Sequence, residues 1–480
     1  MSTYKIVLFF CCFQFSLLAQ EQNNVSVAFH SPSFQHKMYY LAGYYGKYTV
    51  LLDSVNASNE GSIIFKNNKK YTEGIYLLVD ANKSMVAEFI MDEKQQFSID
   101  VNVENTSKNT VRNSKTNQDF LEFNIFLKSR FSKLDVLNNS LGVQKTATDS
   151  LLVKNKIAAI QKEINNYKFD YIENNSKSVI SLLFKLSQSV DSYFDIIDNS
   201  TLLKNKTDSL NYLKNNFFKG IDFSDARLLR NPFLEKKIAT YFGSFVKPTS
   251  EEITQEVFKI LDSTGSKENE LFSYLSLYFI NTYSAPKIMG LDRVFINIYN
   301  QYFKNKEYSW LTAQQKLAIR DTNIDLKDNL IGNSAPNLFM KTRLDKRIDL
   351  HDVDASFIVL VFWDPNCGHC KTELPKINKT YHELWKEKGV KIFAVNINAD
   401  LLEQWNTYIE KEQLKDWIHV VPSSVVTGNY TKEDVDFQTL YNVHQTPVLY
   451  LLDANKKMIA KKVSFEKYID IIKKVEIKLN

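Results

Sequence analysis

The apolar residues in the first part of the chain come in short runs separated by turn residues. β-Branched and aromatic side chains are frequent in these runs, which is typical of strands that bury one face. The runs are VSVAF, KMYYLAGYYG, KYTVLLDSV, GSIIF, GIYLLV, MVAEFI and QFSIDV. This pattern predicts a small all-β domain, a sandwich or a barrel, over residues 25–103.

The spacing of apolar residues becomes helical in the middle of the chain. Phe120, Phe123 and Leu127 begin a series that recurs every three or four residues, as one buried helix face requires. The pattern predicts an α-helical domain over residues 119–327. Between the two regions, residues 102–118 read NVENTSKNTVRNSKTNQ and offer almost nothing to bury, so they predict a linker.

Strand-like and helix-like runs alternate in the last part of the chain. A cluster of Gly, Asn, Ser and Pro in IGNSAPNLFM, residues 331–340, marks its beginning. The runs predict a mixed sheet covered by helices on both faces, which is an α/β domain over residues 332–480. The predicted strands are 357–363, 391–397, 448–452 and 458–463, and a helix over 464–478 closes the chain.

The first twenty residues, MSTYKIVLFFCCFQFSLLAQ, have the pattern of a secretory signal peptide. One cation, Lys5, precedes an apolar run from Ile6 to Leu18, which is shorter than the roughly 20 residues of a spanning helix. We therefore expect export to the periplasm or cell envelope. Cys11 and Cys12 lie inside the run and follow large Phe side chains, so a lipid anchor is not expected.

Composition and charge restrict the classes of partner. Of the 480 residues, 44% are hydrophobic and 24% charged, which suits a soluble globular protein with several domains. The formal net charge of +5 comes from 60 basic and 55 acidic residues, and the basic residues form no block. Nucleic acid is therefore not an expected partner.

After removal of the signal peptide the chain keeps two cysteines, Cys367 and Cys370. A pair at C-x-x-C spacing in so long a chain indicates redox chemistry, because disulfide stapling would need many more cysteines. No metal is expected, since a closed zinc site needs four ligands and no second C-x-x-C is present. Covalent haem attachment would need a His where Lys371 stands.

The segment FIVLVFWDPNCGHCKTELPKI places a strand before the cysteine pair and a helix after it. Cys367 would then lie at the helix N-terminus, where unpaired N–H groups and the dipole favour a thiolate. We expect Cys367 to be the nucleophile and Cys370, one turn later, to resolve the mixed disulfide. His369 could donate a hydrogen bond to the thiolate or could be an exposed spacer.

Residues 332–480 resemble the exported TlpA/ResA-like branch of the thioredoxin fold. The resemblance rests on GNSAPNLFM, on FWDPNCGHC, on Pro375 inside the helix, and on Thr446-Pro447 before a strand. It implies a thiol-disulfide oxidoreductase whose redox-active disulfide, Cys367–Cys370, needs no other cofactor. It also implies a cis Thr446–Pro447 bond against the dithiol and places Trp363, Thr446 and Pro447 in substrate binding.

The sequence departs from the wider thioredoxin pattern near the site. Val361 stands where many thioredoxins have a buried Asp that relays protons, and Asn366 replaces the usual Trp before the first cysteine. Glu373 matches a Glu of the TlpA/ResA-like branch. This residue could accept the proton of Cys370 or could be an ordinary helix-surface carboxylate.

The layout of a β domain, a helical domain and a redox domain resembles exported thioredoxin-like proteins of Bacteroidetes-type bacteria. The first two domains carry no motif with assignable chemistry, so we interpret them as partner-binding or spacing modules. Expected partners are exported proteins with thiols or disulfides, together with a membrane electron donor or acceptor.

Three functions are compatible with these patterns. The leading one is disulfide exchange with exported proteins, in a direction left open because CGHC resembles oxidising isomerases whereas the TlpA/ResA-like context suggests reduction. A peroxiredoxin-like peroxidase would need Thr-x-x-Cys, whereas residues 364–367 read Asp-Pro-Asn-Cys. A non-catalytic binding protein of the cell envelope is the third.

Overall fold

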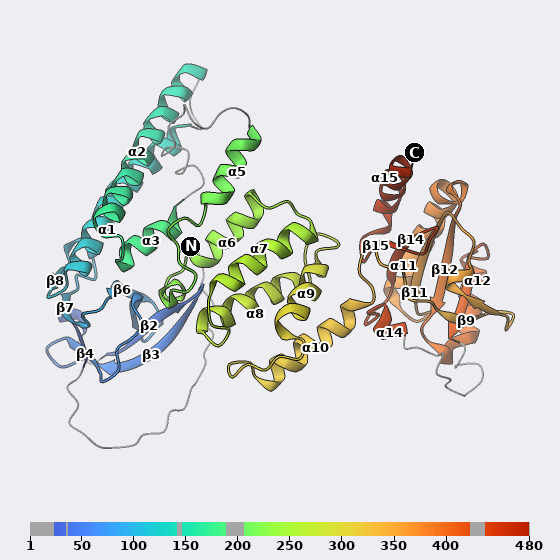
Figure 1. Cartoon of the computed structure of the whole chain (residues 1–480), viewed down its shortest axis with the longest axis horizontal. Coiled ribbons are helices and arrows are strands. Elements are labelled where there is room, and N and C mark those ends of the chain that lie inside the picture. Colours follow the sequence, from blue (N-terminus) through green and yellow to red (C-terminus); the bar gives the residue numbers. More distant parts are fainter. Residues whose placement is uncertain (1–23, 35–36, 142–145, 189–205, 423–436, 480) are drawn as a thin grey trace. The chain divides into compact units, whose positions relative to one another are not determined.

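The computed structural model describes residues 24–34, 37–141, 146–188, 206–422 and 437–479 (Figure 1). The predicted signal peptide lies outside these residues. The chain is multidomain, with an all-β region, a helical region and an α/β region in that order. Two compact units divide it: Met1–Lys247 with Ile260–Tyr274, and Pro248–Lys259 with Leu275–Asn480.

The all-β region is a sandwich of two four-stranded sheets. The strand orders are β4-β1-β7-β8 and β3-β2-β5-β6. Alternate side chains of both sheets meet in one core, in which Phe29 and Phe89 pack edge to face with ring centroids 4.9 Å apart. All seven predicted strands are confirmed: β1 (Val25–His30), β2 (Met38–Tyr45), β3 (Tyr48–Asn56), β4 (Ser62–Asn67), β5 (Gly74–Asp80), β6 (Met85–Met91) and β7 (Gln96–Asp100).

The linker predicted over residues 102–118 is wrong. The short strand β8 (Thr110–Arg112) lies in this stretch and extends the sheet by pairing antiparallel with β7, and α1 begins at Lys115. The buried side chain of Asn117 exchanges two hydrogen bonds with the backbone of Ile90. Backbone pairing at a sheet edge and a buried amide need no apolar side chains, so the hydrophobic pattern could not reveal them.

The helical region begins against the β-sandwich. Phe120 and Phe123 of α1 pack on Ile75 and Ile90, which are outer-face residues of β5 and β6. In Figure 1, α1 and α2 run side by side. No helix within the described ranges is long and apolar enough to cross a bilayer. The helices are α1 (Lys115–Leu141), α2 (Ala147–Asn174), α3 (Val179–Ser187), α5 (Lys206–Asn216), α6 (Leu234–Ser244), α7 (Ser250–Ser263), α8 (Glu270–Ser284), α9 (Asp292–Ile298) and α10 (Ala313–Lys327).

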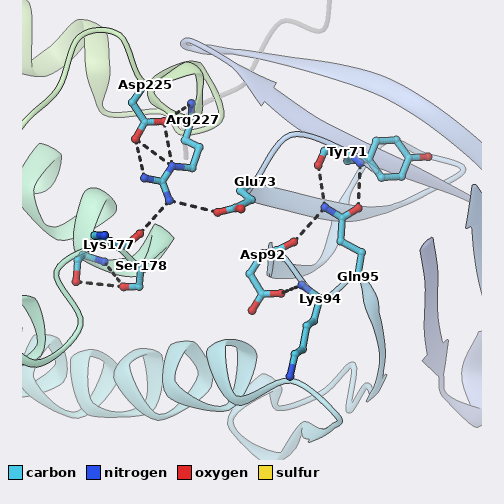
Figure 2. Close-up of polar contacts among 10 residues, drawn as sticks. Tyr71, Glu73, Asp92, Lys94, Gln95, Lys177, Ser178, Asp225 and Arg227 are labelled. Atoms are coloured by element: carbon cyan, nitrogen blue, oxygen red, sulfur yellow. Dashed lines mark hydrogen bonds and ion pairs between the residues drawn. The ribbon is translucent and has the colours of Figure 1, made fainter. Parts of the chain in front are cut away.

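Arg227 links three segments of the first unit. Its guanidinium pairs with Asp225 at 2.7 Å and with Glu73 at 3.2 Å, and it donates to the carbonyl of Lys177 at 2.9 Å (Figure 2). Glu73 precedes β5, whereas the other two partners belong to the helical region. The planar guanidinium can serve several acceptors at once, so one side chain joins the β-sandwich to the helices.

The α/β region is a seven-stranded mixed sheet in the order β10-β9-β13-β12-β11-β14-β15. All seven residues of β11 are buried, and separate apolar cores cover the two faces of the sheet. The strands are β9 (Phe339–Thr342), β10 (Arg347–Asp349), β11 (Phe357–Trp363), β12 (Val390–Asn396), β13 (Ile418–Pro422), β14 (Val448–Asp453) and β15 (Met458–Lys461). The helices are α11 (Gly368–Thr380), α12 (Leu402–Lys411), α14 (Phe437–Leu440) and α15 (Tyr468–Leu479).

The four strands predicted in this region are confirmed as β11, β12, β14 and β15, and the closing helix as α15. Sequence patterns missed β9, β10 and β13. These strands have three to five residues each, and β13 buries the polar ring of His419, so none of them forms a continuous apolar run.

A buried ion pair attaches the last helices to the α/β sheet within the second unit. The ammonium group of Lys461 on β15 pairs with the carboxylate of Asp292 on α9, and their side chains are only 9% and 5% exposed. Lys461 also donates to the side chain and carbonyl of Asn329, at 2.9 and 2.8 Å. Each buried charge therefore has a partner, which is what makes its burial tolerable.

Removal of the Asp292 carboxylate would leave the Lys461 ammonium buried without its counter-charge. We expect Asp292→Ala to lower the free energy of unfolding of the second unit by about 3–5 kcal/mol, the usual cost of breaking a buried pair. Urea unfolding followed by tryptophan fluorescence measures it. As a control, Arg320→Ala removes an exposed pair with Asp321 on α10 and should cost less than about 1 kcal/mol. Equal losses in both variants would contradict this account.

Candidate active site

A short turn between β11 and α11 positions the cysteine pair. The Asp364 carboxylate accepts from the backbone N–H of Asn366 at 2.6 Å, and the Asp364 carbonyl accepts from the N–H of Cys367 at 3.1 Å. Asn398, just beyond β12, donates to the same carboxylate at 3.0 Å. Because β11 and β12 are parallel neighbours, their carboxyl ends bring these residues together.

The sequence interpretation did not include Asp364 or Asn398. The Asp-Pro dipeptide in WDPN is a turn signal that could have indicated Asp364, since an Asp side chain often hydrogen-bonds the backbone two residues on. Nothing local indicated Asn398, which reaches the turn only through the pairing of two strands.

Cys367 is the N-cap residue of α11, and its side chain is partly buried. Its Sγ accepts from the backbone N–H of Cys370 at 3.3 Å and lies 3.2 Å from the carbonyl oxygen of Thr446. Burial acts to raise the pKa of the Cys367 thiol, but hydrogen bonds with Cys370, with the Thr446 side chain and with the backbone of His369 outweigh it and lower the pKa. The first cysteine therefore lies where a thiolate is stabilised.

Cys370 lies one helical turn further, and its side chain is only 1% exposed. Burial, and next its hydrogen bond with Cys367, raise the pKa of the Cys370 thiol to about 12. Both cysteines are free thiols in this structure. The two sulfurs thus differ in exposure and in acidity, although they are three residues apart.

The segment before β14 forms the other side of the site. The Thr446–Pro447 peptide bond is cis, as the resemblance implied. Two residues at the end of the helical region hold the same segment: Asn329 donates to the carbonyl of Leu440 at 3.2 Å, and Asp325 lies 3.1 Å from the His444 ring. The Thr446 carbonyl therefore faces Cys367 from a segment anchored at two points.

The other predicted site residues lie around the dithiol in different environments. His369 is exposed in the first turn of α11. Glu373, one turn beyond Cys370, is half-buried and pairs with Lys376 at 2.9 Å. Trp363 has no exposed surface and packs against the Tyr408 ring, with centroids 5.4 Å apart. In this structure Trp363 supports the site from the core and presents no contact surface.

A cleft of about 500 Å³ lies between α11, the segment that leads into β14 and the segment that follows β15. Its lining residues include Glu373 and Ile377 of α11. They also include Pro447 and Leu449 at the start of β14, and Phe465 after β15. The cleft is open and contains both apolar and polar groups, as a surface for an extended polypeptide requires. Among the described residues, no group of three or more His, Cys, Asp or Glu side chains is arranged to hold a metal ion.

A strand, an N-capping cysteine of lowered pKa, a buried second cysteine and a facing cis-proline segment define a thioredoxin-fold thiol-disulfide oxidoreductase. The AhpC/TSA family model matches residues 331–461. A second model, a domain of unknown function (DUF5106), matches residues 159–329.

The similar proteins include curated enzymes and solved structures. Thiol-disulfide oxidoreductase ResA of Bacillus cereus is 28% identical over 131 residues, 27% of this chain and 68% of the relative. ResA of Bacillus subtilis is 28% identical over 130 residues, 27% of this chain and 64% of the relative. A domain of a possible thiol-disulfide isomerase from Cytophaga hutchinsonii is 36% identical, covering 31% of this chain and 95% of that one, with a TM-score of 0.28.

The residues matched by the AhpC/TSA family model, 331–461, include both cysteines of the dithiol. This C-terminal domain belongs to the TlpA/ResA-like family of thioredoxin-fold oxidoreductases.

The difference between the two thiols predicts selective alkylation of the reduced protein. We expect iodoacetamide to modify Cys367 first, with a rate that falls as the pH drops through the lowered pKa of that thiol. Cys370 should stay unmodified throughout the neutral range, because its pKa of about 12 leaves it protonated. Peptide mass spectrometry across a pH series measures both. Equal labelling of the two cysteines at pH 7 would contradict the assignment.

Proposed function

We propose that this protein exchanges disulfides with exported proteins through the Cys367–Cys370 dithiol. The observation that carries the proposal is the asymmetry of the pair, with Cys367 partly exposed at the N-terminus of α11 and Cys370 buried behind it. One sulfur can reach a protein substrate, and the other can attack only from within. The pair needs no cofactor beyond its own disulfide.

In the reducing direction, the Cys367 thiolate attacks one sulfur of a substrate disulfide. A mixed disulfide forms, and the other substrate sulfur leaves as a thiolate. Cys370 then loses its proton and attacks Cys367 Sγ, which closes the Cys367–Cys370 disulfide and releases the second substrate thiolate. Two electrons pass to the substrate, and the reverse sequence oxidises a substrate dithiol.

Two neighbouring side chains have proposed roles in these steps. Glu373 accepts the proton of Cys370, which that buried thiol would not release to water at neutral pH. The half-buried position of Glu373 one turn beyond Cys370 supports this role. His369 adds positive charge near Cys367 when its imidazole is protonated, which favours the thiolate.

Thr446 and Pro447 are the proposed substrate-contact residues. The Thr446 carbonyl lies beside Cys367, and Pro447 lines the cleft of about 500 Å³, so a substrate chain bound there would bring its sulfur to Cys367. Trp363 contributes beneath this surface by fixing the end of β11. The resemblance to the TlpA/ResA-like branch supports the same assignment.

The direction of net transfer depends on the reduction potential of the pair. A value near or below about −270 mV, the thioredoxin figure, would assign a reductase that needs a membrane electron donor. A value near about −180 mV, the disulfide isomerase figure, would assign an oxidase or isomerase that needs an electron acceptor. The reduction potential is measured by equilibrating the purified mature chain with glutathione redox buffers.

The proposed location is the periplasm or cell envelope, without a lipid anchor. The signal-like first twenty residues support export, and so does the placement of the two remaining cysteines in one redox motif. The β-sandwich and the helices before α9 are proposed as partner-binding or spacing modules.

Replacement of the second cysteine should trap the substrate. We expect Cys370→Ser to accumulate mixed disulfides with exported proteins, because nothing remains to resolve the bond at Cys367. Cys367→Ser should form none and should abolish exchange with a model protein disulfide. Non-reducing gels of cell-envelope fractions show the adducts. Equal adduct formation by both variants would contradict the roles, and a Cys367→Ser strain without any phenotype would favour a binding protein.

A proton acceptor for Cys370 predicts a slow second step when it is removed. We expect Glu373→Gln to slow closure of the Cys367–Cys370 disulfide by at least about tenfold at pH 7, with little change in formation of the mixed disulfide. Stopped-flow tryptophan fluorescence can separate the two steps. The matched control is Glu383→Gln, which changes an exposed glutamate paired with Lys379 and should leave both rates unchanged. An unaltered second step in Glu373→Gln would exclude the role.

A further inference from the structure

We propose that the substrate groove continues beyond the α/β domain onto residues 284–290, which are the last residue of α8 and the loop that follows it. There it binds an extended, apolar and acidic segment of the substrate chain that flanks the reacting cysteine. This inference rests on the proposed disulfide exchange and adds a determinant of specificity outside the dithiol.

Two cavities of the second unit share part of their walls. Asn442, Lys462 and Val463 line the cleft of about 500 Å³, together with Pro447. A second cavity of about 380 Å³ is lined by the same three residues and by the whole of residues 284–290. The two cavities therefore adjoin at these three residues. The path that we propose for the substrate chain runs past them from the first cavity to the second.

Exposed apolar side chains occur on the loop at the far end of this path. Ile288 is 51% exposed and Met289 is 37% exposed, although both lie on a loop of the second cavity wall. Large apolar side chains that rim a cavity are typical of a protein-binding surface. Contact with an apolar substrate side chain would remove them from water.

The charges around the second cavity favour an acidic ligand. Its charged lining residues are Lys287, Lys461, Lys462 and Asp292, three cations against one carboxylate. The carboxylate is already paired with Lys461. Lys287 and Lys462 therefore give this end of the path a positive potential, which attracts an acidic segment and disfavours a basic one.

The loop is held in place before any ligand arrives. The backbone N–H of Lys461 lies 3.4 Å from the Met289 sulfur, and the ion pair between Lys461 and Asp292 fixes the residues that follow the loop. β15 is an edge strand of the sheet, so an extended chain can lie along its end. A preformed surface loses less entropy on binding than a mobile one.

The test compares peptide and small-molecule disulfides on the full-length protein. The probes are synthetic peptides with one cysteine in a mixed disulfide with thionitrobenzoate, whose release is coloured. A leucine is moved through successive positions on either side of the cysteine in an otherwise polar sequence, with flanking glutamates or lysines. The small probe is the mixed disulfide of glutathione with thionitrobenzoate.

We expect the reduced wild-type protein, in a single turnover, to prefer leucine at particular positions, and glutamate over lysine beside it, by about three- to tenfold in the second-order rate constant of thionitrobenzoate release. The double variant Ile288→Ser/Met289→Ser should lose the leucine preference through a higher half-saturating peptide concentration, with the limiting single-turnover rate unchanged, and Lys287→Glu should reverse the charge preference. Neither should alter the rate with the glutathione probe. Leu344→Ser, which changes a 79% exposed leucine on the turn between β9 and β10, is the control and should behave as wild type.

Three results would overturn the inference. Leucine and charge preferences that are unchanged in both loop variants would place specificity elsewhere. An equal loss in Leu344→Ser would indicate a general surface effect. A dimer that becomes a monomer in the double variant, with peptide preference intact, would assign the loop to self-association. By contrast, wild-type protein that releases no thionitrobenzoate from any probe would refute the proposed exchange itself.

Discussion

The site depends on the junction at which the buried strand β11 ends and α11 begins. Every residue of β11 is buried between two apolar cores, so the strand cannot shift, and the Asp364 turn leads from it directly into the helix. Cys367 is therefore fixed at the one position where its sulfur meets unpaired helix N–H groups. The proposed chemistry of the chain follows from that placement.

The same junction gives two cysteines opposite properties. A helical turn carries the chain from the surface to the core, so Cys367 stays accessible while Cys370 is buried. Helix N–H groups favour a thiolate on the first, and lack of water favours a thiol on the second. An exchange reaction needs this order, because a resolving cysteine that was equally reactive would compete for substrate.

The helices next to the α/β domain are structurally part of it. The buried pair of Lys461 with Asp292 ties α9 to the edge strand, and Asn329 and Asp325 hold the segment that presents Thr446 to Cys367. A segment assigned by sequence to a helical domain thus contributes to the walls around the redox site. This arrangement connects substrate selection, as we propose it, to residues far from the dithiol in sequence.

The sequence by itself determined the features that depend on local pattern. Short apolar runs rich in β-branched and aromatic residues predicted the seven strands of the β-sandwich, and the strand, C-x-x-C and helix of FIVLVFWDPNCGHCKTELPKI predicted the environment of Cys367. Only the tertiary structure decided what joins distant segments. It paired the polar β8 with a sheet edge, brought Asn398 to the active-site turn and buried Trp363. Burial of one face of a helix or strand produces a regular pattern of apolar residues in the sequence. Backbone pairing and long-range contacts produce no such pattern in the residues that make them.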